Sequence, residues 1–172
     1  MKKGKVVFFF PAFSSLEATA PLGILAVATP LLQAGYQVKI IDSTITGDFQ
    51  KRILEEVEDA LALAVSLVTG PMIRETAAIG RAVKEKFPHK PIILGGWHPS
   101  LLPDQTLEAS FVDVVVRGQG EESLLQVLDR IGAGASLEDV PGVGFKREGQ
   151  LVLTPERPLP RRSLSWAFFS CR

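Results

Sequence analysis

Short apolar runs alternate with longer amphipathic stretches along the chain up to about residue 131. Uninterrupted apolar runs of four to eight residues are typical of buried strands, and apolar positions three or four apart over more than ten residues are typical of helices. We therefore expect strands at 5–10, 38–42, 61–67, 91–94 and 113–116. Helices are expected at 21–33, 49–59, 71–87 and 121–131, with a short helical turn at 104–109.

Local signals mark where these helices begin and end. Asp48 is a typical cap residue before the second helix, Pro71 suits the first turn of the third, and Pro88 stops it. Gly35 is expected to end the first helix in the left-handed conformation. Pro30 departs from this pattern, because a proline inside a helix costs about 3 kcal/mol unless the helix is kinked or starts there.

Strands that are apolar throughout predict a parallel sheet covered by helices on both faces. The expected fold class is α/β, a doubly wound five-stranded parallel sheet. Beyond Gly132 the pattern changes, and 143–146 and 151–154 flank a glycine turn that predicts a β-hairpin appended to the sheet. We therefore divide the chain into an α/β domain at 1–134 and a hairpin with a linker at 135–172.

The end of the chain is rich in proline and then in aromatic residues. Three prolines between 155 and 160 precede an apolar segment at 164–169. Such a segment either folds back onto the domain or leads into a second domain. The residues alone leave both alternatives open.

Composition narrows the class of protein. A chain of 172 residues with 46% hydrophobic and 22% charged residues has the length of about one globular domain. Nineteen basic residues balance nineteen acidic ones, so we expect neither nucleic acid nor an anionic membrane as partner. The apolar run at 6–10 is too short for a signal peptide or a membrane span. The single cysteine, Cys171, excludes an internal disulfide framework. We expect a cytoplasmic protein.

Ligands of parallel α/β sheets bind in the loops at the carboxyl ends of the strands. The loop at 11–20 is longer than the usual two to six or so residues, which is typical of a functional loop. It contains neither G-x-G-x-x-G nor G-K-[ST], which counts against a dinucleotide or P-loop site. The loops after the third, fourth and fifth strands carry small or hydroxylated residues, namely Ser66, Thr69, Gly70, Gly95, Gly96, Gly118 and Gly120.

Few residues could perform acid–base or nucleophilic chemistry. His98 has no second ligand at metal spacing, so a hydrogen-bonded structural role is favoured over a metal ligand or base. Glu121 and Glu122 most simply stabilise a helix N-terminus. Cys171, as nucleophile or metal ligand, has neither a base nor a rigid element nearby. We expect no catalytic residue and no metal site in this chain.

Taken together and in order, the loops form a recognisable series. It comprises Pro21-Leu22-Gly23, Gly35-Tyr36-x-Val38-x-Ile40-Ile41-Asp42, Ser66-x-x-Thr69, Leu94-Gly95-Gly96-x-His98-Pro99-Ser100 and Asp113-x-Val115-Val116-Arg117-Gly118-x-Gly120-Glu121. Over residues 5–131 the chain resembles the N-terminal cobalamin-binding domain of B12-dependent radical SAM enzymes. The resemblance implies a flavodoxin-like (Rossmann-type) sheet of order 2-1-3-4-5, with cobalamin lying across its carboxyl edge.

The resemblance also implies which residues contact the cofactor. Those near the corrin ring would be Ser14, Leu22 and Gly23. Those under its lower face or along the nucleotide tail would be Ser66, Val68, Thr69 and Gly70. The tail channel would be lined by Gly95, Gly96, Trp97 and His98 and closed by Gly118, Gln119, Gly120 and Glu121. The family often has Gly-Glu-Gly-Glu in this last loop, so Gln119 stands where the family has its first carboxylate.

The B12-binding modules of mutases and methionine synthase carry Asp-x-His-x-x-Gly after the first strand, which supplies the lower axial imidazole. The two histidines here, His89 and His98, both lie far from that position. We therefore expect cobalamin in a base-off form without histidine ligation, which tunes the transfer of a methyl group.

The resemblance implies a partner in cis, a radical SAM barrel with Cys-x-x-x-Cys-x-x-Cys for a [4Fe-4S] cluster, and SAM. That motif is missing from this sequence, and in such proteins it follows an aromatic stretch like the one at 166–171. We expect this chain to be a piece that binds cobalamin and does not catalyse alone. The parent is expected to be a methyltransferase whose cobalt carries the methyl group to an unactivated carbon.

Two alternatives stay open. One is a flavodoxin-like enzyme that uses a flavin or nucleotide. The other is a sensor or interaction module that has kept the fold and lost its ligand, which Pro30 slightly favours. The sequence identifies neither the substrate nor the oligomeric state.

Overall fold

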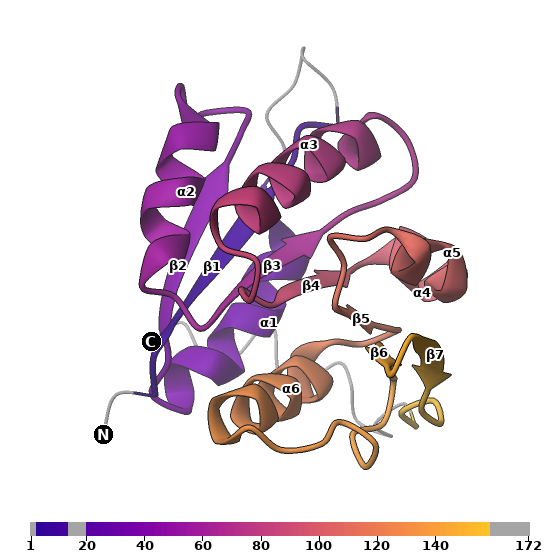
Figure 1. Ribbon diagram of the computed structural model, residues 1–172. Coiled ribbons are helices and arrows are strands. Elements are labelled where there is room, and N and C mark those ends of the chain that lie inside the picture. The colour runs from indigo at the N-terminus through magenta and orange to yellow at the C-terminus, as the bar shows by residue number, and fades with distance from the viewer. Residues whose placement is uncertain (1–2, 14–19, 159–172) are drawn as a thin grey trace.

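The computed structural model describes residues 3–13 and 20–158, which form a seven-stranded sheet with helices on both faces (Figure 1). The strands are β1 (Lys5–Phe10), β2 (Gln37–Asp42), β3 (Ala62–Ser66), β4 (Ile92–Gly95), β5 (Val114–Val116), β6 (Val143–Arg147) and β7 (Gln150–Leu153). The helices are α1 (Leu22–Gln33), α2 (Phe49–Glu58), α3 (Pro71–Lys86), α4 (Trp97–Leu101), α5 (Pro103–Glu108) and α6 (Glu121–Ala133).

The parallel part of the sheet confirms the expected fold. Strands β1 to β5 pair in parallel in the order 2-1-3-4-5. Side chains alternate between the two faces, so that Val7 and Phe9 pack under α2 and α3 while Val6 and Phe8 pack under α1 and α6. Strands β1, β3, β4 and β5 are buried on both faces and nearly all apolar, which is the pattern that predicted them, whereas the edge strand β2 also carries Gln37, Lys39 and Asp42.

The hairpin is part of the main sheet and not an appendage to it. Strand β6 pairs antiparallel with β5 and with β7, so the hairpin extends the sheet beyond its parallel strands. Val143 and Phe145 are buried in the layer beneath α6. Gly144 allows the close approach, because a Cβ there would lie 2.5 Å from Leu153 and 2.8 Å from Val115. The apolar positions of β6 therefore complete the core.

Two helical details differ from the pattern. The Gly-rich segment after β4 contains α4, since the Leu102 N–H donates to the His98 carbonyl across one helical turn. Helix α1 continues through Pro30, whose carbonyl accepts from Ala34 at 2.9 Å. Ile24, Ala28 and Leu31 are buried on both sides of this proline, and that burial offsets its cost.

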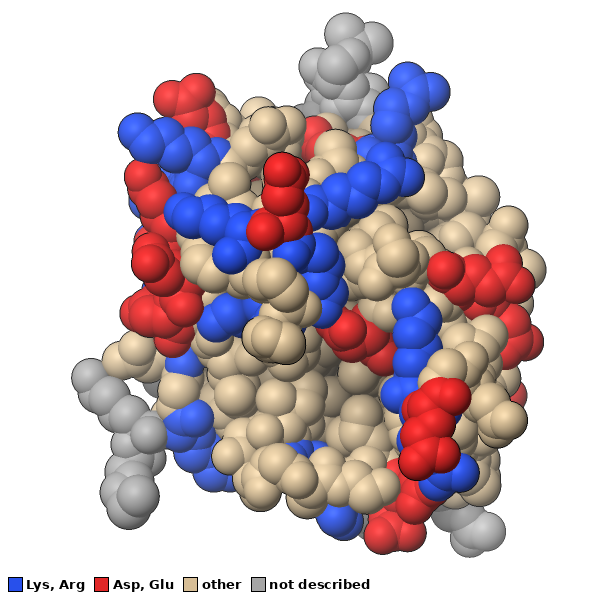
Figure 2. Space-filling view, viewed as in Figure 1, with Lys and Arg blue, Asp and Glu red and all other residues tan. Residues whose placement is uncertain are grey.

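The charged residues form small mixed clusters. On the face shown in Figure 2, basic and acidic side chains lie close together across the upper half and along both sides, and a mostly uncharged area lies in the lower middle. Within the described ranges, no helix has the length and apolar character that crossing a bilayer requires.

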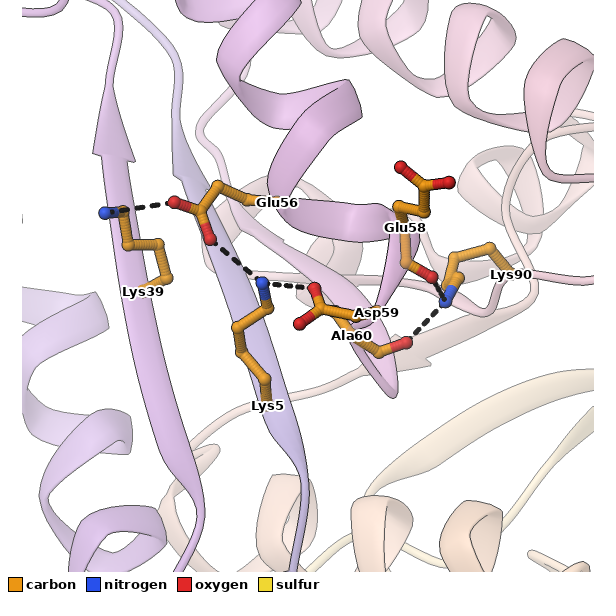
Figure 3. Close-up of polar contacts among 7 residues, drawn as sticks. All are labelled: Lys5, Lys39, Glu56, Glu58, Asp59, Ala60 and Lys90. Carbon is orange, nitrogen blue, oxygen red and sulfur yellow. Dashed lines mark hydrogen bonds and ion pairs between the residues drawn. The ribbon is translucent and has the colours of Figure 1, made fainter.

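One such cluster fastens α2 to the amino ends of the strands (Figure 3). Lys5 of β1 pairs with Glu56 at 2.9 Å and also with Asp59, and Lys39 of β2 reaches Glu56 at 3.1 Å. Lys90 donates to the carbonyls of Glu58 and Ala60 where α2 ends. Cations at these carbonyls complement the helix dipole.

These contacts shift the pKa values of their members. Hydrogen bonds from Lys5 and then from Lys39 hold the pKa of Glu56 below its ordinary 4.5, and a hydrogen bond from Lys5 lowers the pKa of Asp59. Burial of Lys5 lowers its pKa, but the bonds to Asp59 and Glu56 outweigh that effect and raise it. A carboxyl group with a lowered pKa stabilises the fold above its unfolded pKa and loses that contribution as pH falls.

The Lys5 cluster predicts how stability responds to acid. Lys5→Met should reduce the loss of unfolding free energy between about pH 5 and pH 3, because the pKa values of Glu56 and Asp59 then move toward those of the unfolded chain. Urea denaturation across that range measures it. Lys51→Met is the control, since Lys51 makes only an exposed contact of 3.9 Å with Glu55. Identical pH profiles for Lys5→Met and the unsubstituted protein would contradict the prediction.

Candidate functional site

A cavity of about 190 Å³ lies at the carboxyl edge of the parallel strands, between the sheet and helices α1 and α6. Its inner surface is apolar and comes from the middle and ends of the strands, namely Phe8, Ala64, Val65, Ile93 and Val116. Helix α1 contributes Gly23, Ala26 and Val27, and Leu124 of α6 lies opposite. The polar lining is concentrated in Ser66 and in the residues at the start of α6. This edge is where open α/β sheets bind their ligands.

Two glycines of the cavity lining stand where the neighbouring residues leave little room for a side chain. At Gly96 the backbone has φ +98°, and a Cβ would lie 2.6 Å from the Leu67 carbonyl oxygen, so only glycine fits. At Gly120 a Cβ would lie 3.2 Å from Val27 and 3.5 Å from Val116, which places it between α1 and the sheet. A side chain at either position would occupy space that now belongs to the loop or to the cavity.

Ser100 joins two of the loops that line the cavity. Its hydroxyl donates to the Gly96 carbonyl at 2.7 Å and accepts from the Gly118 N–H at 2.9 Å. The loops after β4 and β5 are therefore held at a fixed separation by one side chain. Ser100 belongs to the motif after β4, but no role is predicted for it from the sequence; its position one helical turn after Gly96 is the available signal.

The loop after β5 is held from a second side. The Arg117 N–H donates to the Gly142 carbonyl at 2.8 Å, and the Arg117 guanidinium donates to the Thr154 carbonyl. Its continuation starts α6, where the Leu124 N–H donates to the Gly120 carbonyl at 2.8 Å. Residues 118–121, which join β5 to α6, form one wall of the cavity. This wall is therefore fixed by both the sheet and the segment after β7.

Eight of the residues predicted as cofactor contacts line this cavity together. They are Gly23, Ser66, Gly95, Gly96, Gly118, Gln119, Gly120 and Glu121. They come from four separate loops and helix ends that the parallel topology brings to one edge. Their contact with a cofactor stays a prediction.

The other predicted contacts lie elsewhere. Leu22 and Trp97 are the first residues of α1 and α4 and are 71% and 73% exposed. Val68, Thr69 and Gly70 follow β3 toward α3, outside the cavity lining. Ser14 and Cys171 lie outside the described residues.

His98 lines a different cavity, on the other face of the sheet. This second cavity, also about 190 Å³, lies between α3, α4 and α5 and includes Thr76 and Gln105. The Thr76 hydroxyl is buried and has no hydrogen-bond partner among the described residues. The His98 Nδ1 lies 3.0 Å from the Thr69 hydroxyl, a contact that fits a hydrogen-bonded structural role.

Glu75 of α3 fixes the start of the long loop after β1. Its Oε2 accepts from the Ala12 N–H and from the Ser43 hydroxyl, both at 2.8 Å. The loops after β1 and β2 are therefore tied to the same carboxylate. The sequence analysis missed this residue, because nothing in the local pattern around Glu75 distinguishes it from other surface acids.

A family model described as the B12 binding domain matches residues 13–128. The anaerobic magnesium-protoporphyrin IX monomethyl ester cyclase of Synechocystis is 25% identical over 83% of this chain and 30% of its own length. An uncharacterized methyltransferase of Pyrococcus horikoshii is 26% identical over 92% of this chain and 36% of its own length. The chain thus spans about a third of the curated relatives that it matches.

A solved structure shows the same fold at low sequence identity. The radical S-adenosylmethionine methyltransferase TsrM from Kitasatospora setae, with cobalamin and a [4Fe-4S] cluster bound, has a TM-score of 0.73 and 21% identity. The similarity covers 94% of this chain and 30% of that one. The motif series, the 2-1-3-4-5 sheet and the matched family model agree, and the chain belongs to the B12-binding domain family.

Proposed function

We propose that this domain holds cobalamin with the nucleotide tail in the cavity beneath α1 and α6 and the corrin ring across the carboxyl edge of the sheet. The observation that carries the proposal is an apolar, glycine-walled cavity at that edge in a B12-binding family chain. At about 190 Å³ it is smaller than the roughly 300–1,000 Å³ that encloses a drug-sized ligand. It therefore suits one end of a large ligand.

The lining fits that end chemically. Phe8, Ile93 and Val116 present apolar surface to a flat aromatic base. Ser66 and the backbone at the start of α6 lie among the lining residues, where they are available to phosphate or amide oxygens of the tail. Cobalamin, when bound, supplies a cobalt that accepts and donates a methyl group.

The positions of the histidines support binding without histidine ligation of cobalt. His98 belongs to the second cavity and contacts Thr69. His89 follows α3 and precedes β4, so it lies at the amino end of that strand. Neither residue follows β1, the position from which the axial imidazole comes in the mutase-type modules.

We propose that the α/β domain at 1–134, whose sheet is extended by the hairpin within 135–172, lies in cis to a radical SAM barrel that binds SAM and a [4Fe-4S] cluster. Support comes from TsrM, in which the matching region is 30% of a cobalamin- and cluster-containing methyltransferase.

Methyl transfer through cobalt is the reaction we propose for the parent. The Synechocystis relative is named a cyclase, which makes cyclisation the second candidate. Balanced charge supports a protein without nucleic-acid or membrane partners, and the single cysteine supports a cytoplasmic one.

A visible absorption titration of the chain with hydroxocobalamin tests the proposal. We expect a saturable shift to a base-off spectrum, and we expect the same bound spectrum for His98→Ala, because His98 does not line the cavity. Absence of any spectral change at saturating protein would overturn cobalamin binding. A bound spectrum that His98→Ala alters would overturn only the claim about the axial ligand.

Gly120→Ala tests whether the cavity holds the tail. The added methyl group lies 3.2 Å from Val27 and, since Gly120 lines the cavity, takes space from the tail, so we expect roughly a tenfold rise in Kd for hydroxocobalamin, about 1.4 kcal/mol. Gly132→Ala, at the far end of α6 with Leu61 3.9 Å away, is the control and should leave Kd unchanged. Equal Kd values for the two variants, with unchanged circular dichroism, would place the tail elsewhere.

Ser100→Ala tests the connection between the two glycine loops. Loss of its hydroxyl leaves the Gly118 N–H without that partner, so we expect faster amide exchange at Gly118. We also expect the Kd for hydroxocobalamin to rise about fivefold, since one hydrogen bond contributes roughly 1 kcal/mol. Ser100→Thr, which keeps the hydroxyl, should bind as the unsubstituted chain does. Ser136→Ala removes an exposed contact to Glu138 and is the control. Normal exchange at Gly118 in Ser100→Ala would refute the role.

A further inference from the structure

The segment after β7 continues alongside the residues before β6 and is held there by hydrogen bonds of its backbone and of the Thr154 hydroxyl. We call residues 154–157 the strap. The Thr154 hydroxyl donates to the Val143 carbonyl at 3.1 Å and accepts from the Val143 N–H at 3.0 Å. The Pro155 carbonyl accepts from the Gly142 N–H at 2.7 Å. The strap is therefore an ordered continuation of the hairpin.

Arg157 then fastens the strap to the first two turns of α6. Its Nε donates to the Ser123 hydroxyl at 2.8 Å, and its two terminal nitrogens donate to Glu122 at 2.9 Å and Gln126 at 2.6 Å. The Arg157 side chain is only 15% exposed. An exposed ion pair contributes little, but a mostly buried guanidinium with all three nitrogens engaged is held in one geometry.

The contact is built into the surrounding fold. Ser123 is fully buried and donates to the Pro141 carbonyl at 2.9 Å while it accepts from Arg157. Gly142 has φ +75°, and a Cβ there would lie 3.4 Å from the Arg157 Cβ. Glycine at this position therefore lets the strap approach α6 closely.

The strap is hydrogen-bonded to residues on both sides of the cavity wall formed by 118–121. Arg157 binds Glu122 and Ser123, which directly follow the cavity residues Gly120 and Glu121. From the other side, Arg117 donates to the Thr154 carbonyl and precedes the cavity residue Gly118. The wall and the strap share these contacts, so neither can shift without the other.

We propose that Arg157 is a positioning residue that couples the cofactor cavity to the chain that follows the domain. Arg157 holds the first turn of α6 against the strap. In this way Arg157 favours the arrangement of residues 118–121 that the bound nucleotide tail of cobalamin requires. Occupancy of the cavity then stabilises the strap, and the strap strengthens binding by the same factor, because coupling between two sites is reciprocal. This inference rests on the proposed binding of cobalamin in that cavity.

Hydroxocobalamin affinity and amide hydrogen exchange together test the coupling. In the unsubstituted chain, we expect cobalamin to slow exchange at the Gly142 N–H, which bonds the strap and does not line the cavity. Arg157→Gln should abolish that slowing and raise Kd by about fivefold or more, the usual lower end of such coupling. Arg147→Gln is the matched control, since Arg147 lies in the same hairpin and pairs with Glu138.

Glu122→Gln provides a milder version of the test, because Glu122 is exposed and its replacement removes a charge without opening the core. It should reduce the slowing at Gly142 and raise Kd in the same direction. If the unsubstituted chain fails to bind cobalamin, the proposed function itself fails. If it binds, and both variants keep its Kd and its protection of Gly142, the coupling is overturned even where their melting temperatures fall.

Discussion

Burial of the parallel strands on both faces is the constraint on which the rest of the structure depends. Val7 and Phe9 face one helical layer, and Val6 and Phe8 face the other, so helices must cover both sides. Parallel strands in turn require crossover helices, and every strand-to-helix loop then lies at the same edge. The grouping of the glycine loops there follows from the topology, before any ligand is considered.

The cavity forms where this packing is left incomplete. Away from the carboxyl edge, the layer beneath α1 and α6 is closed by Leu31, Val127 and Leu128. At the carboxyl edge several lining positions are glycines, among them Gly23, Gly95 and Gly118, and a gap of about 190 Å³ remains in the packing. Such a gap forfeits dispersion contacts, so its presence beside a well-packed core favours a ligand as the missing packing partner.

The parts of the fold that sequence predicted are those set by local pattern. The spacing of apolar residues, together with the positions of glycine, proline and cap residues, predicted the parallel strands and the long helices. The ordered loop motifs added the strand order through family resemblance. The pattern did not show that β6 joins the sheet, because pairing between β5 and β6 depends on Val143 and Phe145 finding space under α6. Eight predicted contacts meet in one cavity, whereas His98 faces another, since α4 turns this part of the Gly-rich segment away. Ser100 and Arg157 act through partners 18 and 34 residues away, and no local spacing contains that information.

Stability and binding are concentrated at opposite edges of the same sheet. The Lys5, Glu56 and Asp59 cluster holds α2 at the amino ends of the strands, while the cavity at the carboxyl ends is apolar and bordered by glycine. The ion pairs that fasten α2 therefore lie away from the residues that line the cavity. At the carboxyl edge, order comes from hydrogen bonds instead, through Ser100 on one side of the wall and the strap on the other. Helix α6 takes part in both the core and that wall, so a change in the strap reaches the cavity through a rigid element, without any need for a flexible loop.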